Sequence, residues 1–292
     1  MTAPSTPQQR MISIAGHVGS GKSTVARIIA DRTGMDLFST GGVFRRLADR
    51  LGMTVLELNE YARGHPEVDD EVDGHLRRLA DDPRPLVIDS RMAWFFVPDS
   101  FKVFIVVDAA EGARRVYGAG RHDEHHDSID AAREKGKTRE RVEARRYLAL
   151  YGVVRDDWRN YDLIVDSTHA PAEAVADAVL STVASPPPIQ PRCMLSPRRL
   201  LPSRARGTDF AVGPTSDISV AVCDGFPVIV AGHGTVMAAI EGGRSLVECR
   251  LAAYGRPPSR SGVTPAKVRA WEAANGFSFD TLPAWARPEE EG

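Results

Sequence analysis

The sequence has few cysteines, no long apolar run and almost no net charge. Cys193, Cys223 and Cys249 are too few and too scattered for a disulfide framework or a zinc site, which favours a reducing cytosol. No apolar run approaches the roughly 18 residues that a membrane-spanning helix needs, and the polar opening MTAPSTPQQR lacks the apolar core of a secretion signal. A formal charge of -2 gives no overall attraction to nucleic acid or membrane, so such a contact would need a local patch. We therefore expect a cytoplasmic protein without a membrane partner.

Prolines divide the chain unevenly. Residues 185–192, SPPPIQPR, are too rich in proline for a helix or an inner strand, and this predicts a stiff linker. The expected division is a first domain over residues 1–184, the linker, and a second domain over residues 193–292. With 292 residues, 42% of them hydrophobic, the chain is long enough for this arrangement.

Strand-like and helix-like segments alternate in the first domain. Apolar runs that read as buried strands cover RMISIAG, PLVIDSR, FKVFIVVD and YDLIVDST, with amphipathic segments between them. Such alternation predicts an α/β fold with a parallel sheet covered by helices on both faces. Thr54 and Glu57 form a predicted capping box, and Pro171 marks the first turn of a closing helix. In the second domain Asp224-Gly225 predicts a hairpin within a small α+β fold.

The segment IAGHVGSGKST contains the pattern G-x-x-x-x-G-K-[ST]. It lies between a predicted strand and a predicted helix, as a phosphate-binding loop requires. In such a loop, backbone amides and the positive end of the helix hold phosphate groups, a lysine reaches the β and γ phosphates, and a hydroxyl binds Mg²⁺. We expect ATP and Mg²⁺ as cofactors, with Lys22 as a catalytic residue and Ser23 as the metal ligand. The predicted cofactor-binding residues are Gly16, His17, Val18, Gly19, Ser20, Gly21, Lys22, Ser23 and Thr24.

The loop alone does not name the acceptor. The chain lacks the N-K-x-D segment of a GTPase, and it carries several spaced arginines that suit phosphoryl transfer, which depends on positioning and charge neutralisation. Asp89 stands at the carboxyl end of a predicted strand, where parallel sheets bind ligands. It could hold the magnesium site or act as a general base toward a hydroxyl acceptor, and the sequence leaves both roles open.

Residues 12–184 resemble the archaeal-type cytidylate kinases of the nucleoside monophosphate kinase group. The matching segments are GSGKSTVARIIADRTG, STGGVFRRLADRLGMTVLELNEYA, PEVDDEVDGHLRRLA, LVIDSRMAW and RERVEARRYLALYGV. The resemblance implies that Arg45 and Arg91 bind the acceptor. It also implies a mobile lid between Arg115 and Arg146, whose Arg139 and Arg146 clamp the donor phosphates, so that Arg91, Arg139 and Arg146 join Lys22 and Asp89 as catalytic candidates.

Residues from 192 to about 254 loosely resemble the ParB-like superfamily, many of whose members act on DNA. The resemblance rests on MLSPRRLLPS and on FPVIVAGHGTVMAAIEGG, and a basic cluster, SPRRLLPSRAR, with Arg198, Arg199, Arg204 and Arg206, lies at its start. Interleaved arginines of this kind can follow a phosphate backbone.

A kinase core joined to a DNA-associated module resembles the bacteriophage kinases that phosphorylate 5-hydroxymethyluracil in DNA on the way to hypermodified thymine. The stretch from Asp89 to Trp94 adds to this resemblance. Our first hypothesis is therefore a kinase for that base in phage DNA, working in the host cytoplasm. The alternatives are a kinase for free pyrimidine nucleoside monophosphates and an ATP-dependent DNA-binding switch.

Overall fold

A computed structural model describes most of the chain. The described residues are 11–62, 64–119, 127–185, 190–204, 217–255 and 262–287. Within these ranges, no helix is both long and apolar enough to cross a membrane.

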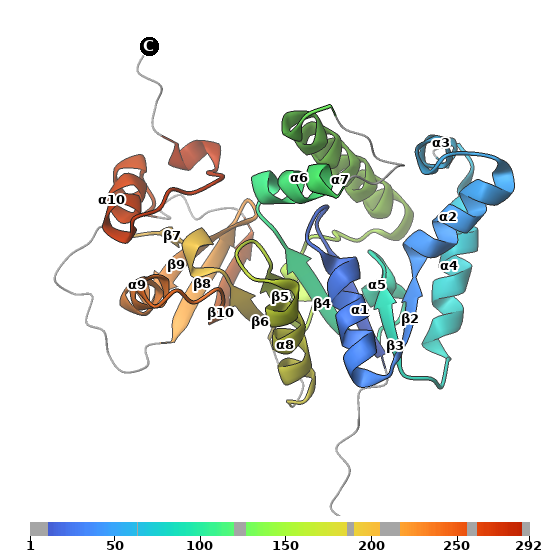
Figure 1. Cartoon of the computed structure of the whole chain (residues 1–292), viewed down its shortest axis with the longest axis horizontal. Helices are drawn as coiled ribbons and strands as arrows, with labels where there is room; N and C mark the ends of the chain where they lie inside the picture. Colours follow the sequence, from blue (N-terminus) through green and yellow to red (C-terminus); the bar gives the residue numbers. More distant parts are fainter. Residues whose placement is uncertain are drawn as a thin grey trace, which may run out of the picture.

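One mixed sheet runs through the molecule from end to end (Figure 1). The strand order is β2-β3-β1-β4-β5-β6-β10-β8-β9-β7. The strands are β1 Met11–Gly16, β2 Asp36–Ser39, β3 Leu86–Asp89, β4 Phe101–Val106, β5 Leu163–Asp166, β6 Arg192–Leu195, β7 Leu201–Pro202, β8 Ile218–Cys223, β9 Phe226–Ala231 and β10 Val247–Gly255.

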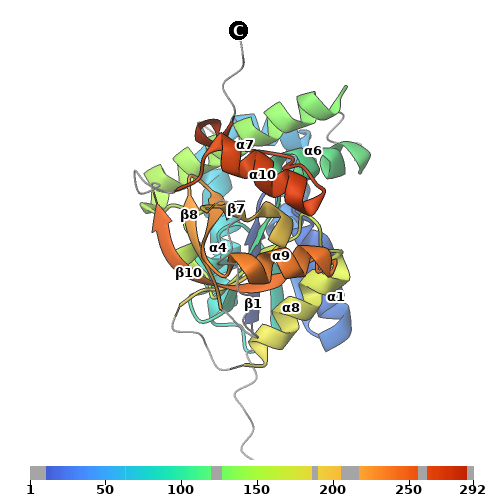
Figure 2. The ribbon, with the colours of Figure 1, turned by 90° about the vertical axis from the view of Figure 1, so that its left-hand side faces the viewer.

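Helices cover both faces of this sheet. The helices are α1 Lys22–Thr33, α2 Thr40–Leu51, α3 Val55–Tyr61, α4 Pro66–Ala80, α5 Ala93–Phe96, α6 Ala109–Gly118, α7 Ile129–Tyr151, α8 Ala172–Val183, α9 His233–Glu241 and α10 Pro265–Asn275. Figure 2 shows α9 and α10 beside the C-terminal strands, where α9 packs on β8 and α10 on β7.

The first five strands are parallel, and their two faces bury different helices. Ile12 and Ile14 of β1 pack in one apolar cluster with α1 and α8, while Ile88 of β3 packs in another with α4, α5 and Tyr147 of α7. Strands whose side chains alternate between two covered faces read as nearly continuous apolar runs. The predicted α/β fold with helices on both faces is confirmed.

Local signals in the sequence also agree with the structure. The side chains of Thr54 and Glu57 form a capping box at the start of α3. Asp224 and Gly225 adopt positive φ angles of 50° and 81° in the turn between the antiparallel strands β8 and β9. A turn with two positive φ angles matches the twist of a hairpin, which is why Asp-Gly predicts one.

The predicted lid is largely a helix. The expected mobile segment between Arg115 and Arg146 contains the last turn of α6 and most of α7, which packs against α6. Positions 120–126 of this segment lie outside the described residues. α7 has only a weak amphipathic pattern, because charged residues cover its exposed face and Glu143 also occupies a buried position. Hydrophobic periodicity therefore did not predict this helix.

The sheet continues across the predicted domain boundary. Strand β6 pairs in parallel with β5 through Leu163 and Arg192, and then antiparallel with β10. We call the residues before the expected linker the first half of the chain and those after it the second half. One apolar cluster contains Phe104 and Ile164 from the first half together with Leu195 and Val220 from the second. Part of the expected linker, residues 186–189, lies outside the described residues. The division at residues 185–192 remains a prediction, but the two sides share a sheet and a core.

We expect the two halves to unfold together. Leu195 is fully buried in the shared cluster, so Leu195→Ala should lower the free energy of unfolding by about 2–5 kcal/mol and leave a single transition. Leu148→Ala is the matched control, since this leucine is 54% exposed and a surface change costs about 0.5 kcal/mol or less. Calorimetry of the full chain measures both quantities. Two transitions, with only the later one shifted by Leu195→Ala, would contradict a shared core.

Candidate active site

The phosphate-binding loop joins β1 to α1 and depends on its glycines. Gly19 and Gly21 have φ angles of 75° and 77°, which side chains larger than hydrogen rarely allow. A Cβ atom on Gly16 would lie 2.5 Å from the carbonyl oxygen of Ile105, and one on Gly19 would lie 2.3 Å from that of Gly112. The loop is therefore pressed between β4 and α6, and a larger residue at position 16 or 19 would clash with them. Thr24 follows in the first turn of α1.

Asp89 joins the loop to the end of β3. Its carboxylate accepts a hydrogen bond from the Ser23 hydroxyl, with Oγ and Oδ2 2.7 Å apart, and pairs with Lys22 at 3.2 Å between Nζ and Oδ1. The aspartate is 5% exposed. Burial lowers the pKa of Lys22, while the charge of Asp89 raises it. Sequence analysis placed all three residues in one site, and the structure brings them together.

The same three residues suit a nucleotide-bound magnesium ion. Mg²⁺ prefers oxygen ligands and is commonly held by one or two protein oxygens together with phosphates and water. Ser23 and Asp89 supply such oxygens side by side at the phosphate loop. Among the described residues, the structure contains no cluster of three or more acidic, histidine or cysteine side chains that would hold a metal without a nucleotide.

A second group of charges surrounds the carboxylate of Glu143 on α7. Arg91, which follows β3, pairs with it, as does Arg139, with 3.0 Å between Nε and Oε1. The fully buried Arg155 is the third partner, at 3.2 Å between Nη1 and Oε2, and it also pairs with Asp156 at 2.6 Å. Burial, and after it the charge of Arg139, lowers the pKa of Arg91.

This arginine group belongs to the same site as the loop. Arg91 follows two residues after Asp89, which pairs with Lys22, and Glu140, next to Arg139 on α7, accepts from the N–H of Val18 in the loop. Arg155 is fully buried, Arg91 is partly buried and Arg139 is exposed, and all three pair with the carboxylate of Glu143. Guanidinium groups gathered in this way suit an anion with several oxygens.

Two predicted arginines lie elsewhere. Arg146 pairs with Asp69 of α4 at 3.1 Å, and its guanidinium lies 5.6 Å from the centre of the Tyr147 ring. It therefore joins α7 to α4 in the structure. Arg45 is exposed on α2 and forms no ion pair with another described residue. The roles of Arg45 and Arg146 toward acceptor and donor remain predictions.

Sequence analysis missed Glu140, Glu143 and Arg155. Glu140 accepts a hydrogen bond from the backbone N–H of Val18, with 2.8 Å between nitrogen and Oε1. The four-residue spacing of Arg139 and Glu143 was a readable signal for a pair on one helix face. No local pattern marks Arg155, because it lies after the helix and becomes a partner only through folding.

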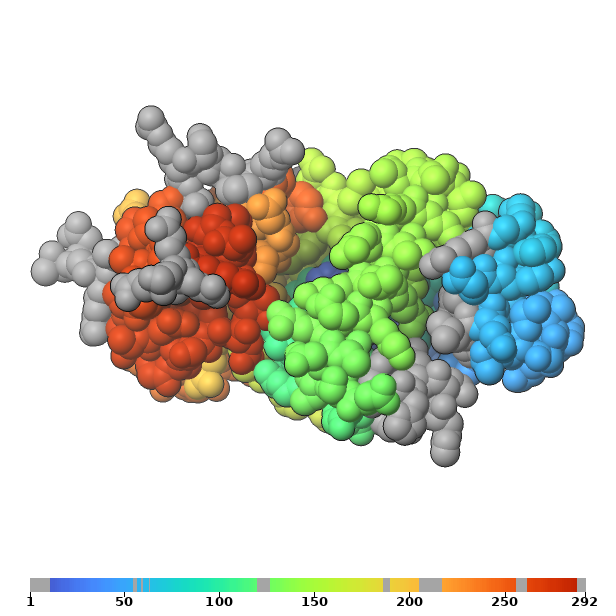
Figure 3. Space-filling model, turned by 90° about the horizontal axis from the view of Figure 1, so that it is seen from above, coloured from blue at the N-terminus to red at the C-terminus, as the bar shows by residue number. Residues whose placement is uncertain are grey.

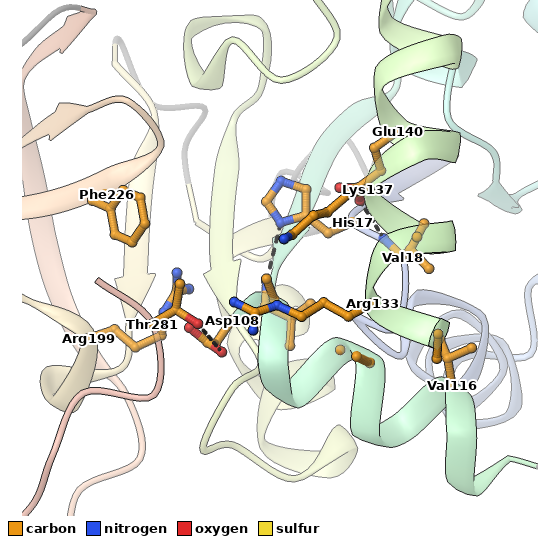
Figure 4. A pocket seen from close by; sticks show the side chains of 16 residues that line it. His17, Val18, Asp108, Val116, Arg133, Lys137, Glu140, Arg199, Phe226 and Thr281 are labelled. Atoms are coloured by element: carbon orange, nitrogen blue, oxygen red, sulfur yellow. Dashed lines mark hydrogen bonds between the residues drawn. The ribbon is translucent and has the colours of Figure 1, made fainter. Parts of the chain in front are cut away.

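Beside the loop lies a cavity of about 150 Å³ (Figure 4). His17 and Val18, which sequence analysis assigned to cofactor binding, lie on one side of it, with α6 and α7 around them. Phe226 and Thr281 from the second half close the other side. The His17 ring packs edge-on against Phe104, with 5.2 Å between ring centres.

A parallel sheet with strand order β2-β3-β1-β4-β5 and a glycine loop between β1 and α1 defines a P-loop kinase. Residues 11–169 match the cytidylate kinase-like family, and the chain belongs to this family.

Known proteins resemble the first half of the chain. Cytidylate kinase from Archaeoglobus fulgidus is 36% identical over 173 residues, which is 59% of this chain and 93% of that protein. Cytidylate kinase from Methanothermobacter thermautotrophicus is 34% identical over 164 residues, which is 56% of this chain and 99% of that protein. The crystal structure of shikimate kinase from Bacteroides thetaiotaomicron is similar with a TM-score of 0.44 at 17% identity, covering 60% of this chain and 98% of that one.

We expect Glu143 to be necessary for the fold because it compensates the charge of the fully buried Arg155 and also pairs with Arg91 and Arg139. Glu143→Ala should lower the free energy of unfolding by about 3–5 kcal/mol, the usual cost of removing one partner from a buried ion pair. Glu134→Ala removes an equal charge from an exposed pair with Lys137 on the same helix and should cost about 1 kcal/mol or less. Chemical denaturation measures both.

Inorganic phosphate provides a second measurement on the same variants. If the three arginines form an anion site, phosphate should raise the Tm of Glu143→Ala more than that of the wild type. Equal shifts in both proteins would mean that the arginines serve only the fold.

Proposed function

We propose that this kinase transfers the γ-phosphoryl group of ATP to the phosphate of a pyrimidine nucleoside monophosphate. The observation that carries the proposal is the arginine group around Glu143, close to Lys22 and Asp89. An anionic acceptor needs such charges in order to approach a triphosphate, and planar guanidinium groups match phosphate oxygens. The similarity to two cytidylate kinases supports the same class of acceptor.

The contacts of Asp89 favour a phosphate acceptor over a hydroxyl. A general base must reach the proton that it removes, and both carboxylate oxygens of Asp89 already contact Lys22 and Ser23. A phosphate is already an anion and needs no base. We infer that Asp89 orients the metal site and the lysine.

The reaction then follows from where the charges lie. The loop amides and Lys22 would hold the donor phosphates, and Ser23 with Asp89 would hold Mg²⁺, which, when bound, neutralises charge on those phosphates. Arg91 and Arg139 would neutralise the oxygens of the transferred group. The side chains position both substrates, and no covalent intermediate with the protein is required.

The second half of the chain favours a second candidate, phosphorylation of 5-hydroxymethyluracil in phage DNA. The family match covers residues 11–169, while the second half continues the sheet and brings Arg199 and Phe226 to a cavity beside the phosphate loop. A ParB-like character of this half, as proposed from its sequence, would suit a polymer acceptor. Its basic cluster is partly occupied, since Arg199 pairs with Asp166 at 3.0 Å and Arg198 lies 5.9 Å from the Phe277 ring centre. Arg206 lies outside the described residues.

Transfer of labelled γ-phosphate from ATP separates these candidates. We expect label on CMP, dCMP or UMP, and a fall of at least about 10²-fold in Lys22→Ala, which lacks the cation at the transferred phosphates. Label on hydroxymethylated DNA alone would select the second candidate. If DNA stimulates ATP hydrolysis and no acceptor becomes labelled, the protein is the DNA-binding switch and both kinase proposals are rejected.

Asp89→Asn should separate metal placement from base catalysis. The amide keeps the shape of the side chain but loses its charge, so the rate should fall about 10²-fold and the Mg²⁺ concentration for half-maximal rate should rise. Asp31→Asn, at an exposed position of α1, should change neither value. Initial rates across a magnesium titration test this. An unchanged magnesium requirement, with a rate that recovers at high pH, would instead indicate a general base.

A further inference from the structure

The cavity beside the phosphate loop is built by both halves of the chain. In Figure 4, Arg133 and Lys137 extend from α7 into the space above Asp108, and Phe226 and Arg199 face it from the other side. Figure 3 shows a hollow between the red and orange C-terminal surface and the green helices, with the blue N-terminal segment visible at its floor. The family match ends at residue 169, so one wall of this cavity comes from outside it.

The cationic side chains that line the cavity differ in the partners that they have. Lys137 pairs with Glu134 at 2.8 Å, and Arg199 pairs with Asp166. Arg133 differs from both, because its Nε atom is buried without a hydrogen-bond partner among the described residues. A buried donor without a partner is costly, and a ligand that accepts from it recovers that cost.

The acidic groups in the cavity are partly engaged, each through one carboxylate oxygen. The carboxylate of Asp108 accepts from the backbone N–H of Ala110 at 2.8 Å and from the hydroxyl of Thr281 at 3.0 Å. Glu140 accepts from the N–H of Val18. The buried Nε of Arg133 therefore remains a donor without a hydrogen-bond partner among the described residues, and an anion would supply the acceptor.

The volume of the cavity and the ring of Phe226 indicate which group the anion is attached to. Phe226 is half-buried at the start of β9 and presents a ring to the space. A volume of about 150 Å³ is enough for one small planar ring, since an apolar cavity of about that size accommodates benzene. A ring that stacks on an aromatic side chain, joined to a group that binds arginine, describes a nucleotide.

We infer that this cavity is a second nucleotide-binding site, which adjoins the donor site at His17 and Val18. The base would lie against Phe226 and the phosphate would accept hydrogen bonds from Arg133. Lys22, Ser23, Asp89 and Arg91 do not line the cavity, which touches the phosphate loop only at His17 and Val18. The nucleotide is either free or part of single-stranded DNA, since both present the same ring and phosphate.

The test counts binding sites on the full-length protein. With a saturating non-hydrolysable ATP analogue present, calorimetric titration with dTMP should give two sites on the wild type. Arg133→Ala and Phe226→Ala should each lose one site or weaken it at least tenfold. Lys135→Ala is the matched control, because it removes a cation from an exposed position of α7 outside the cavity and should keep both sites.

A short thymidine oligonucleotide identifies the source of the nucleotide. If the wild type binds the oligonucleotide, both Arg133→Ala and Phe226→Ala weaken that binding, and no second dTMP site is found, the cavity binds single-stranded DNA. A second dTMP site assigns it to a free nucleotide. Transfer activity at saturating substrate should survive in both variants, so a failure of this inference differs from a failure of the proposed kinase activity.

Two results would overturn the inference. One is unchanged binding of dTMP and of the oligonucleotide by both variants. The other is a matching loss of affinity for the ATP analogue, which would make the cavity part of the donor site. Circular dichroism melting curves confirm that each variant is folded.

Discussion

The contact of Asp89 with Lys22 and Ser23 depends on two neighbouring strands that run in the same direction. In the register of β1 and β3, Ile14 lies opposite Asp89, so the phosphate loop and the aspartate emerge at one edge of the sheet. In a parallel sheet the carboxyl ends of neighbouring strands always lie at the same edge. The covering helices secure this register by burying both faces of the two strands. Placement of the reacting phosphate thus rests on strand order.

The arginine group shows how the same scaffold holds charges that repel one another. Arg91 follows β3, Arg139 belongs to α7 and Arg155 lies after it, so only folding brings them together. Removing several guanidinium groups from water is costly, and Glu143 compensates part of that cost. The proposed anionic acceptor would meet guanidinium groups that the fold has already brought together.

The sequence predicted those parts of the molecule that local chemistry decides. The glycine loop, the capping box of Thr54 and the turn at Asp224 need particular residue types at fixed spacing, and each was found. The family and the core of the fold followed from the same patterns. Glu140 and Arg155 could not be predicted, because their roles come from contacts between distant segments. The prolines at 186–188 suggested a linker, yet nothing local shows that β6 pairs with β5.

That pairing changes how the second half can act. A module on a flexible linker would bring a partner near the active site only by raising its local concentration. Here β6 lies in the same sheet as the phosphate loop, and the hydroxyl of Thr281 donates to Asp108 at the end of β4. Asp108 also caps α6, and a glycine of α6 packs against Gly19 of the loop. The second half is therefore connected to the loop through Thr281, Asp108 and α6, and a ligand bound between the halves would lie next to this connection.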